Sequence, residues 1–92
     1  MANYADTEAY AEAIQALKTF SATVQEDAGS MADRADECVE NCENDEASLK
    51  SQEQVHSYVS AFYQTAEAAQ RTAAAMEKEL EAIREAAAKA QA

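Results

Sequence analysis

The chain carries two stripes of apolar residues, and each stripe repeats at alternating steps of three and four. Such spacing places side chains along one side of an α-helix, and two stripes joined by a short link can pack against each other. The sequence therefore predicts an all-α fold: an antiparallel two-helix hairpin with heptad-like seams. Ser21 is the one polar residue in the first stripe, which otherwise comprises Tyr10, Ile14, Leu17, Val24, Ala28, Met31, Ala35, Cys38 and Cys42. The second stripe comprises Val55, Val59, Phe62, Ala66, Ala69, Ala73, Met76, Leu80, Ile83 and Ala87.

The composition agrees with long helices in a single domain, residues 1–92. The chain has no proline and one glycine, which suits helices and disfavours tight turns and sheets. We expect a first helix at about 5–43, capped by Asn3 or Asp6, and a second helix at about 46–90. The link falls within about 43–50. Two starts compete for the second helix: Asn44 or Asp45 as the cap, or Ser51 with a glutamine three residues on.

Gly29 interrupts the predicted first helix near its middle. A helical glycine costs about 1 kcal/mol relative to alanine, and Ser30 with Asp33 could cap a new helix. A bend or break at Gly29-Ser30 is therefore an alternative to an unbroken helix. The apolar repeat keeps the same phase on both sides of the glycine, so we expect a continuous but bent helix.

Two helices alone bury little apolar surface, and several large residues lie beside the stripes. We expect a partner to complete the hairpin into a four-helix or larger bundle, the partner being another helical hairpin or a second copy in a homodimer. The predicted partner-binding residues are Phe20, Val24, Phe62, Tyr63 and Ala66.

The formal net charge of −11 is concentrated in the first half of the chain. Residues 1–46 hold twelve acids against Lys18 and Arg34, a net charge of −10. This field repels nucleic acid, so nucleic-acid binding is excluded. The acidic block either keeps a small protein in solution or forms a docking surface for a basic partner, and both interpretations stay open.

Cys38, Cys42 and His56 are the residues that most resemble a metal or redox site. Cysteines four apart on a helix could supply two thiolates to a soft metal, but a third and fourth ligand are not evident. A disulfide between them would be strained. We therefore expect two reduced, small core residues on the inward face of the first helix, with no metal and no cofactor.

Catalytic motifs are not found in the sequence. It has no glycine-rich phosphate loop and no serine elbow. Di-metal bundles need a Glu-x-x-His motif on each of two facing helices, and the single histidine of this chain cannot supply two such motifs. We expect a protein that is not an enzyme.

A tyrosine followed four residues later by a glutamate occurs twice, at Tyr4 and Glu8 and at Tyr63 and Glu67. On a helix this spacing places a phenol and a carboxylate on one face. Such short patterns arise often in acidic helices, and a packing or surface role is the alternative.

With two long helices, a short link and a Tyr-x-x-x-Glu element, the chain resembles the small helical-hairpin proteins of bacterial type VII secretion. These are WXG-like proteins and the helical partners of LXG toxins. The Trp-x-Gly turn of that group is replaced here by Glu43-Asn44-Asp45-Glu46, and Tyr63 lies inside the second helix, so the chain is more similar to a toxin-associated partner. The resemblance implies binding to a toxin's N-terminal helical domain, and it makes Tyr63 and Glu67 the candidate secretion motif.

The resemblance leaves two rival hypotheses. One is an acidic cytoplasmic chaperone or phage-type assembly adaptor for a basic helical client. The other is a metal or redox module built on the cysteines and the histidine. No apolar run approaches the roughly 20 residues of a membrane span, and no signal peptide is evident at the N-terminus. We expect a cytoplasmic protein, or one exported without a cleavable signal peptide.

Overall fold

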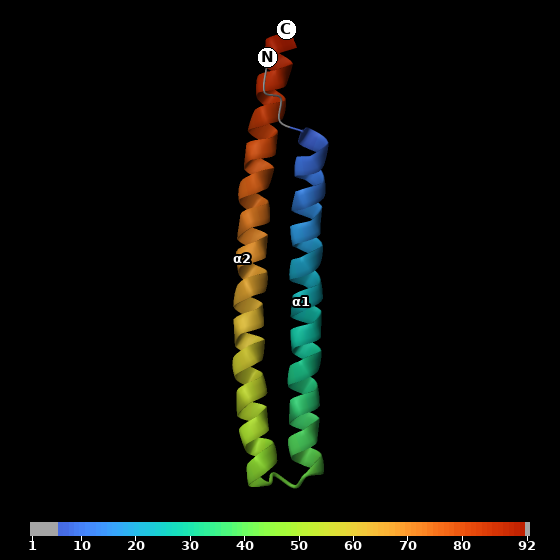
Figure 1. Ribbon diagram of the computed structural model, residues 1–92, viewed down its shortest axis with the longest axis vertical. Helices are drawn as coiled ribbons and strands as arrows, with labels where there is room; N and C mark the ends of the chain where they lie inside the picture. Colours follow the sequence, from blue (N-terminus) through green and yellow to red (C-terminus); the bar gives the residue numbers. More distant parts are fainter. Residues whose placement is uncertain (1–5, 92) are drawn as a thin grey trace.

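Two long helices lie side by side and antiparallel, so the start of α1 and the last turns of α2 lie toward the same end of a rod, with α2 extending further (Figure 1). The computed structural model describes residues 6–91. Helix α1 spans Thr7–Asn41 and helix α2 spans Glu46–Gln91. The molecule measures 71 × 18 × 14 Å, and no strand occurs within residues 6–91. The predicted all-α hairpin is confirmed.

Asp6 caps the start of α1, and it is one of the two residues predicted for this role. Its carboxylate oxygen Oδ1 accepts a hydrogen bond from the backbone N–H of Ala9 at 2.9 Å, which satisfies a donor that the first turn leaves unpaired. Asn3, the other candidate, lies outside the described residues. Near the same end the Tyr10 hydroxyl donates a hydrogen bond to Glu79, which connects α1 to α2.

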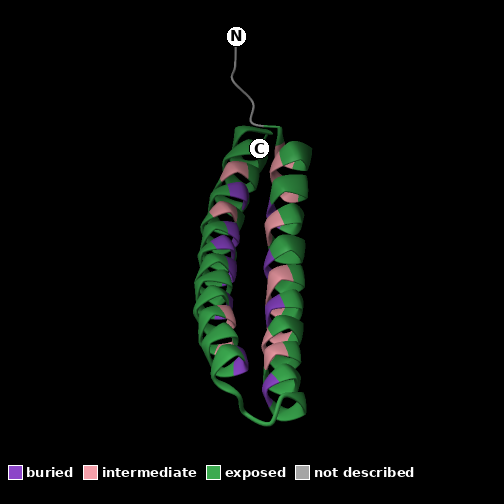
Figure 2. Ribbon diagram, turned by 60° about the horizontal axis from the view of Figure 1, so that its bottom comes forward, coloured by how far each residue is buried: buried purple, intermediate pink, exposed green. Residues whose placement is uncertain are grey.

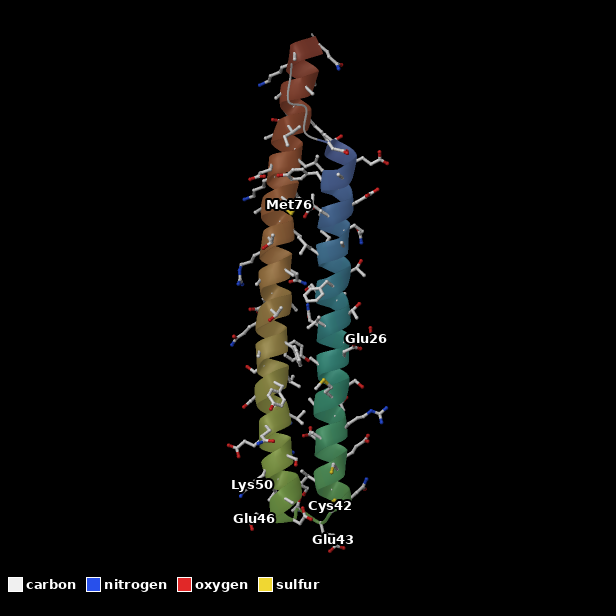
Figure 3. The ribbon with its side chains drawn as sticks, in the orientation of Figure 1. Glu26, Cys42, Glu43, Glu46, Lys50 and Met76 are labelled. Atoms are coloured by element: carbon white, nitrogen blue, oxygen red, sulfur yellow. The ribbon has the colours of Figure 1, made fainter. Side chains whose placement is uncertain are left out.

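The link between the helices is only four residues long, 42–45. Glu43 and Asn44 have left-handed backbone conformations, with φ of 54° and 59°, which reverse the chain at the tip shown in Figure 3. Asp45 then caps α2, because its Oδ1 accepts from the N–H of Ser48 at 2.7 Å, while the Ser48 hydroxyl donates to the Asp45 carbonyl. The alternative start at Ser51 is therefore wrong, and the link is shorter than the expected 43–50.

Helix α1 runs unbroken through Gly29 and Ser30, so the predicted alternative of a break there is wrong. Glycine has a packing role at this position. A Cβ atom placed on Gly29 would lie 3.3 Å from the hydroxyl oxygen of Tyr63, closer than an ordinary van der Waals contact. The missing side chain gives the tyrosine of α2 room to lie across α1.

Small residues dominate the contact between the helices. Buried residues follow the two inner faces (Figure 2), and four of the eight buried apolar side chains are alanines. Ser21 is fully buried among them, and its hydroxyl donates to the backbone carbonyl of Ala66 at 2.9 Å. This bond satisfies the one polar residue of the first stripe and requires the helices to lie close together. The buried apolar set is Ile14, Ala28, Val39, Val59, Ala66, Ala69, Ala73 and Leu80.

The inner face of α1 rotates along the helix, and the cysteines leave it as a result. A straight α-helix drifts by about 20° per heptad relative to a strict seven-residue repeat. After four heptads the accumulated drift approaches the rotation between two consecutive residues of the helix. Val39 is accordingly buried in place of Cys38. Cys38 and Cys42 are both exposed free thiols, so the prediction that they are inward-facing core residues is wrong.

Candidate protein–protein interface

The two long edges of the hairpin, where α1 and α2 meet at the surface, differ in chemistry. One edge is apolar and grooved. We call it the apolar edge and define it by Phe20, Val24, Met31, Cys38, Val55, Tyr58 and Phe62. The other edge is bridged by polar side chains, and we call it the polar edge.

The groove of the apolar edge has two lobes that meet at Met31. The first, the Phe62 lobe, has a volume of about 250 Å³ and is lined by Val24, Asp27, Ala28, Met31 and Phe62. The second, the Cys38 lobe, has a volume of about 340 Å³ and is lined by Met31, Arg34, Ala35, Cys38, Ser48, Ser51, Gln52 and Val55. Met31 lines both lobes, so the two lobes adjoin at this residue.

Large side chains on this edge are substantially exposed. The exposed fractions are 47% for Phe20, 39% for Met31, 58% for Tyr58 and 42% for Phe62. Phe20 precedes Val24 by four residues and Tyr58 precedes Phe62 by four, so each lies one turn away on the same side of its helix. Clustered aromatic side chains beside a groove are typical of a binding surface rather than of scattered exposed residues.

Cross-helix hydrogen bonds and ion pairs occupy the polar edge. Lys18 Nζ lies 2.9 Å from the Glu77 carboxylate, and His56 Nε2 lies 2.9 Å from Asp36 Oδ1. Gln52 also donates to Asp36 Oδ1 at 2.9 Å. Hydrogen bonds from Gln52 and then His56 lower the pKa of Asp36. Lys18 and Asp36 are five helical turns apart, which places them on the same side of α1.

Three of the five predicted partner-binding residues lie on the apolar edge: Phe20, Val24 and Phe62. Tyr63 instead follows His56 by seven residues on the side of the polar edge, and its hydroxyl lies against Gly29. Ala66 has no exposed surface and accepts the Ser21 hydrogen bond through its carbonyl. The prediction that Ala66 forms part of an exposed partner-binding face is therefore wrong.

Met31 and Tyr58 belong to the apolar edge but were not among the predicted partner-binding residues. The strict repeat places Met31 in the seam, because it ignores the rotation that carries Val24, Met31 and Cys38 outward. A second stripe at Val55, Tyr58 and Phe62, with steps of three and four, was the signal in the sequence that identifies this edge on α2.

The candidate secretion motif lies in the middle of α2. The Glu67 carboxylate is within 4.0 Å of Arg71, one turn further along the same helix. Tyr63 is 39% exposed, like Met31, so its side chain reaches the surface while its hydroxyl lies near Gly29. In the other Tyr-x-x-x-Glu copy, Tyr4 lies outside the described residues.

The cysteines and the histidine do not form a common site. The interaction of Cys42 with the neighbouring Cys38 thiol raises the pKa of Cys42, which disfavours the thiolate that a metal requires. His56 pairs with Asp36. Within residues 6–91, no group of three or more His, Cys, Asp or Glu side chains is placed to hold a metal ion.

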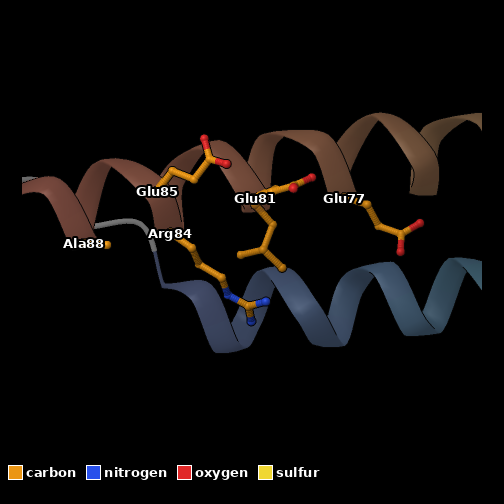
Figure 4. A pocket seen from close by; sticks show the side chains of 6 residues that line it. Glu77, Glu81, Arg84, Glu85 and Ala88 are labelled. Carbon is orange, nitrogen blue, oxygen red and sulfur yellow. The ribbon is translucent and has the colours of Figure 1, made fainter.

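A larger hollow of about 550 Å³ lies toward the C-terminal end of α2. Figure 4 shows its labelled side chains, and every residue that lines it comes from α2: Glu77, Leu80, Glu81, Arg84, Glu85 and Ala88. Charged side chains surround a single leucine there. The apolar edge has more exposed aromatic surface and is the stronger candidate for a binding site.

The chain matches no known family model, and no curated protein or solved structure shows significant similarity to it. Neither α1 nor α2, over the residues described, has a stretch long and apolar enough to cross a membrane.

Proposed function

We propose that the protein is a non-enzymatic interaction protein that binds a helical partner through the apolar edge. The observation that carries this proposal is the exposure of Phe20, Met31, Tyr58 and Phe62 on an edge that also holds two adjoining hollows. Fully burying one such side chain is worth roughly 1.5–3 kcal/mol, so a partner helix laid in the groove would gain several such contributions.

The partner that best fits the hairpin architecture is another helical hairpin or the helical domain of a secreted toxin. In that role the chain acts as a WXG-like type VII secretion partner or targeting factor. It works in the cytoplasm or is exported from the cell. The two-helix fold supports this proposal, because such a hairpin contributes two helices to a bundle and needs others to cover its apolar edge.

A second candidate function is that of an acidic chaperone or phage-type assembly adaptor for a basic helical client. The observation that favours it is the acid content of α1. Glu26, Asp33 and Glu40 each follow an apolar-edge residue by two positions, which places them on nearly the opposite side of the helix. This acidic side would attract a lysine- or arginine-rich chain, and the complex would weaken steeply as salt is added.

The proposal is tested by light-scattering mass measurements on the reduced chain, alone and mixed with the products of neighbouring genes. A defined complex with a helical neighbour is expected, and Phe62→Ser should weaken it by about ten-fold or more. Leu49→Ser is the matched control, because Leu49 is 43% exposed but lies outside the apolar edge. Failure to bind any helical neighbour, or equal loss from both variants, would overturn the proposal.

A further inference from the structure

The apolar edge is self-complementary about Met31, and we infer that it binds a second copy of this chain across a two-fold axis at that residue. The α1 helices of the two copies would lie antiparallel and form a four-helix assembly. This inference rests on the proposed function in one respect: the apolar edge is the binding surface. The inference adds the identity of the partner that binds this edge, namely a second copy of the chain.

The two charged residues of the groove lie on opposite sides of Met31, at nearly equal distances along α1. Asp27 lines the Phe62 lobe and Arg34 lines the Cys38 lobe, four residues before and three residues after Met31. When two α1 helices pack antiparallel with Met31 at the axis, Asp27 of each copy faces Arg34 of the other. Two ion pairs then form at once, which fixes the register and the antiparallel direction.

The apolar parts of the groove are complementary in the same arrangement. Phe62 projects beside Val24 and Ala28, whereas the Cys38 lobe lies on the other side of Met31, beside Val55. A two-fold rotation about Met31 carries the exposed Phe62 ring of one copy over the Cys38 lobe of the other, and the reverse contact forms simultaneously. Because each copy supplies both the ring and the lobe, the contact closes as a dimer.

The charge distribution favours a second copy over a basic helix at this edge. Asp27 and Arg34 are the only charged residues lining the two lobes, so the groove has no net charge. Glu26, Asp33 and Glu40 point away from it. A basic helix would be drawn to that acidic side, whereas two chains of net charge −11 can join at a neutral edge once salt screens their repulsion.

Disulfide trapping tests the position of the axis. In a background with Cys38→Ala and Cys42→Ala, Met31→Cys should form a covalent dimer on mild oxidation, because residues on a two-fold axis approach their own copies. Ser30→Cys is the matched control: its side chain is exposed and adjacent in sequence but points about 100° away around α1. No cross-link from Met31→Cys, or an equal yield from both variants, would overturn the inference.

Sedimentation equilibrium tests the contact and its electrostatics. Phe62→Asp should weaken the dimer by about ten-fold or more, while Leu49→Asp, with the same added charge, should leave it nearly unchanged. Raising NaCl from about 50 mM to about 500 mM should tighten the dimer, because it screens repulsion between acidic chains. A wild-type monomer in both salts, with circular dichroism confirming the helices, would overturn the inference.

Different experimental results would overturn this inference and the proposed function. A monomer that still binds a helical neighbour through Phe62 would overturn the dimer and leave the function. A Met31-centred dimer that binds no neighbour would support the dimer and overturn the function.

Discussion

Gly29 and Tyr63 form a contact in which the absence of a side chain determines the packing. The Tyr63 hydroxyl oxygen is 3.3 Å from the position of a Gly29 Cβ, and the phenol end is free to shift because the residue is 39% exposed. Helical glycine is unfavourable by about 1 kcal/mol relative to alanine. The balance between these two effects determines whether a substitution at position 29 raises or lowers the free energy of unfolding.

Gly29→Ala should raise the free energy of unfolding by about 0.5 kcal/mol in the natural chain and by about 1 kcal/mol in a Tyr63→Phe background. The difference arises because the phenylalanine ring lacks the hydroxyl that an alanine Cβ meets. Urea denaturation followed by circular dichroism measures both values. Equal gains in the two backgrounds would show that the hydroxyl does not constrain position 29.

Ala66 lies where α1 and α2 approach each other closely. Its side chain is fully buried, and its carbonyl accepts the hydrogen bond from Ser21. A larger side chain would push the helices apart and stretch this bond.

Ala66→Leu should therefore lower the free energy of unfolding by about 1–3 kcal/mol. Ala68→Leu is the matched control on the same helix, since Ala68 is exposed, and its effect should stay within about 0.5 kcal/mol. Chemical denaturation of both variants makes the comparison. A neutral Ala66→Leu would contradict close packing at this point.

At the scale of the elements, two aspartates position the link end of α2. Asp45 caps the helix, and its pKa is lowered by hydrogen bonds from the Ser48 side chain and backbone. Asp36 on α1 has a pKa lowered by Gln52 and His56 of α2. In both cases the folded state favours the ionised carboxylate, which accepts more hydrogen bonds than the protonated form.

A lowered folded-state pKa means that the unfolded chain binds more protons in the acid range. The stabilisation is therefore complete above the ordinary aspartate pKa of 3.8 and is lost as the pH falls through the lowered values. At pH about 6 the natural chain should melt at a higher temperature than the Asp36→Asn variant. This difference in melting temperature should shrink toward zero by pH about 2.

Comparing the two proteins at each pH isolates this effect from the general relief of repulsion when a chain of net charge −11 is protonated. Glu85→Gln serves as the control, because it removes a carboxylate far from the link. A constant difference between the natural chain and Asp36→Asn across the pH range would contradict the assignment to the Asp36 charge.

At the scale of the whole molecule, the hairpin is a thin rod 71 Å long, with a core one side chain thick. Because half of the buried apolar side chains are alanines, burial within one hairpin contributes modestly to stability. Further stability is expected from association along the apolar edge.

If the second copy binds only the folded hairpin, mass action makes the melting temperature rise with protein concentration. A hundred-fold increase in concentration is expected to add about 2.7 kcal/mol to the apparent stability of the dimer. Scanning calorimetry over that range measures the effect, and Phe62→Asp should abolish it. A melting temperature that is independent of concentration would contradict association.

How much could be predicted from the sequence depends on how local the determining interactions are. The three-and-four repeat, the Asp6 cap and the acid-rich link are local features, and they predict two helices that pair antiparallel. Phe20 and Phe62 are also predicted from the sequence as partner-binding residues, and both are exposed on the apolar edge.

Only the tertiary structure decided which side of each helix faces inward. A small rotation per turn accumulates over the 35 residues of α1, so Val39 is buried while Met31 and Cys38 move to the surface. The burial of Ala66 and the room left by Gly29 for Tyr63 likewise depend on how closely the helices approach. The two helices and their pairing can be predicted from the sequence alone, because helical periodicity is local. The apolar edge was decided by the rotation of one helix against the other.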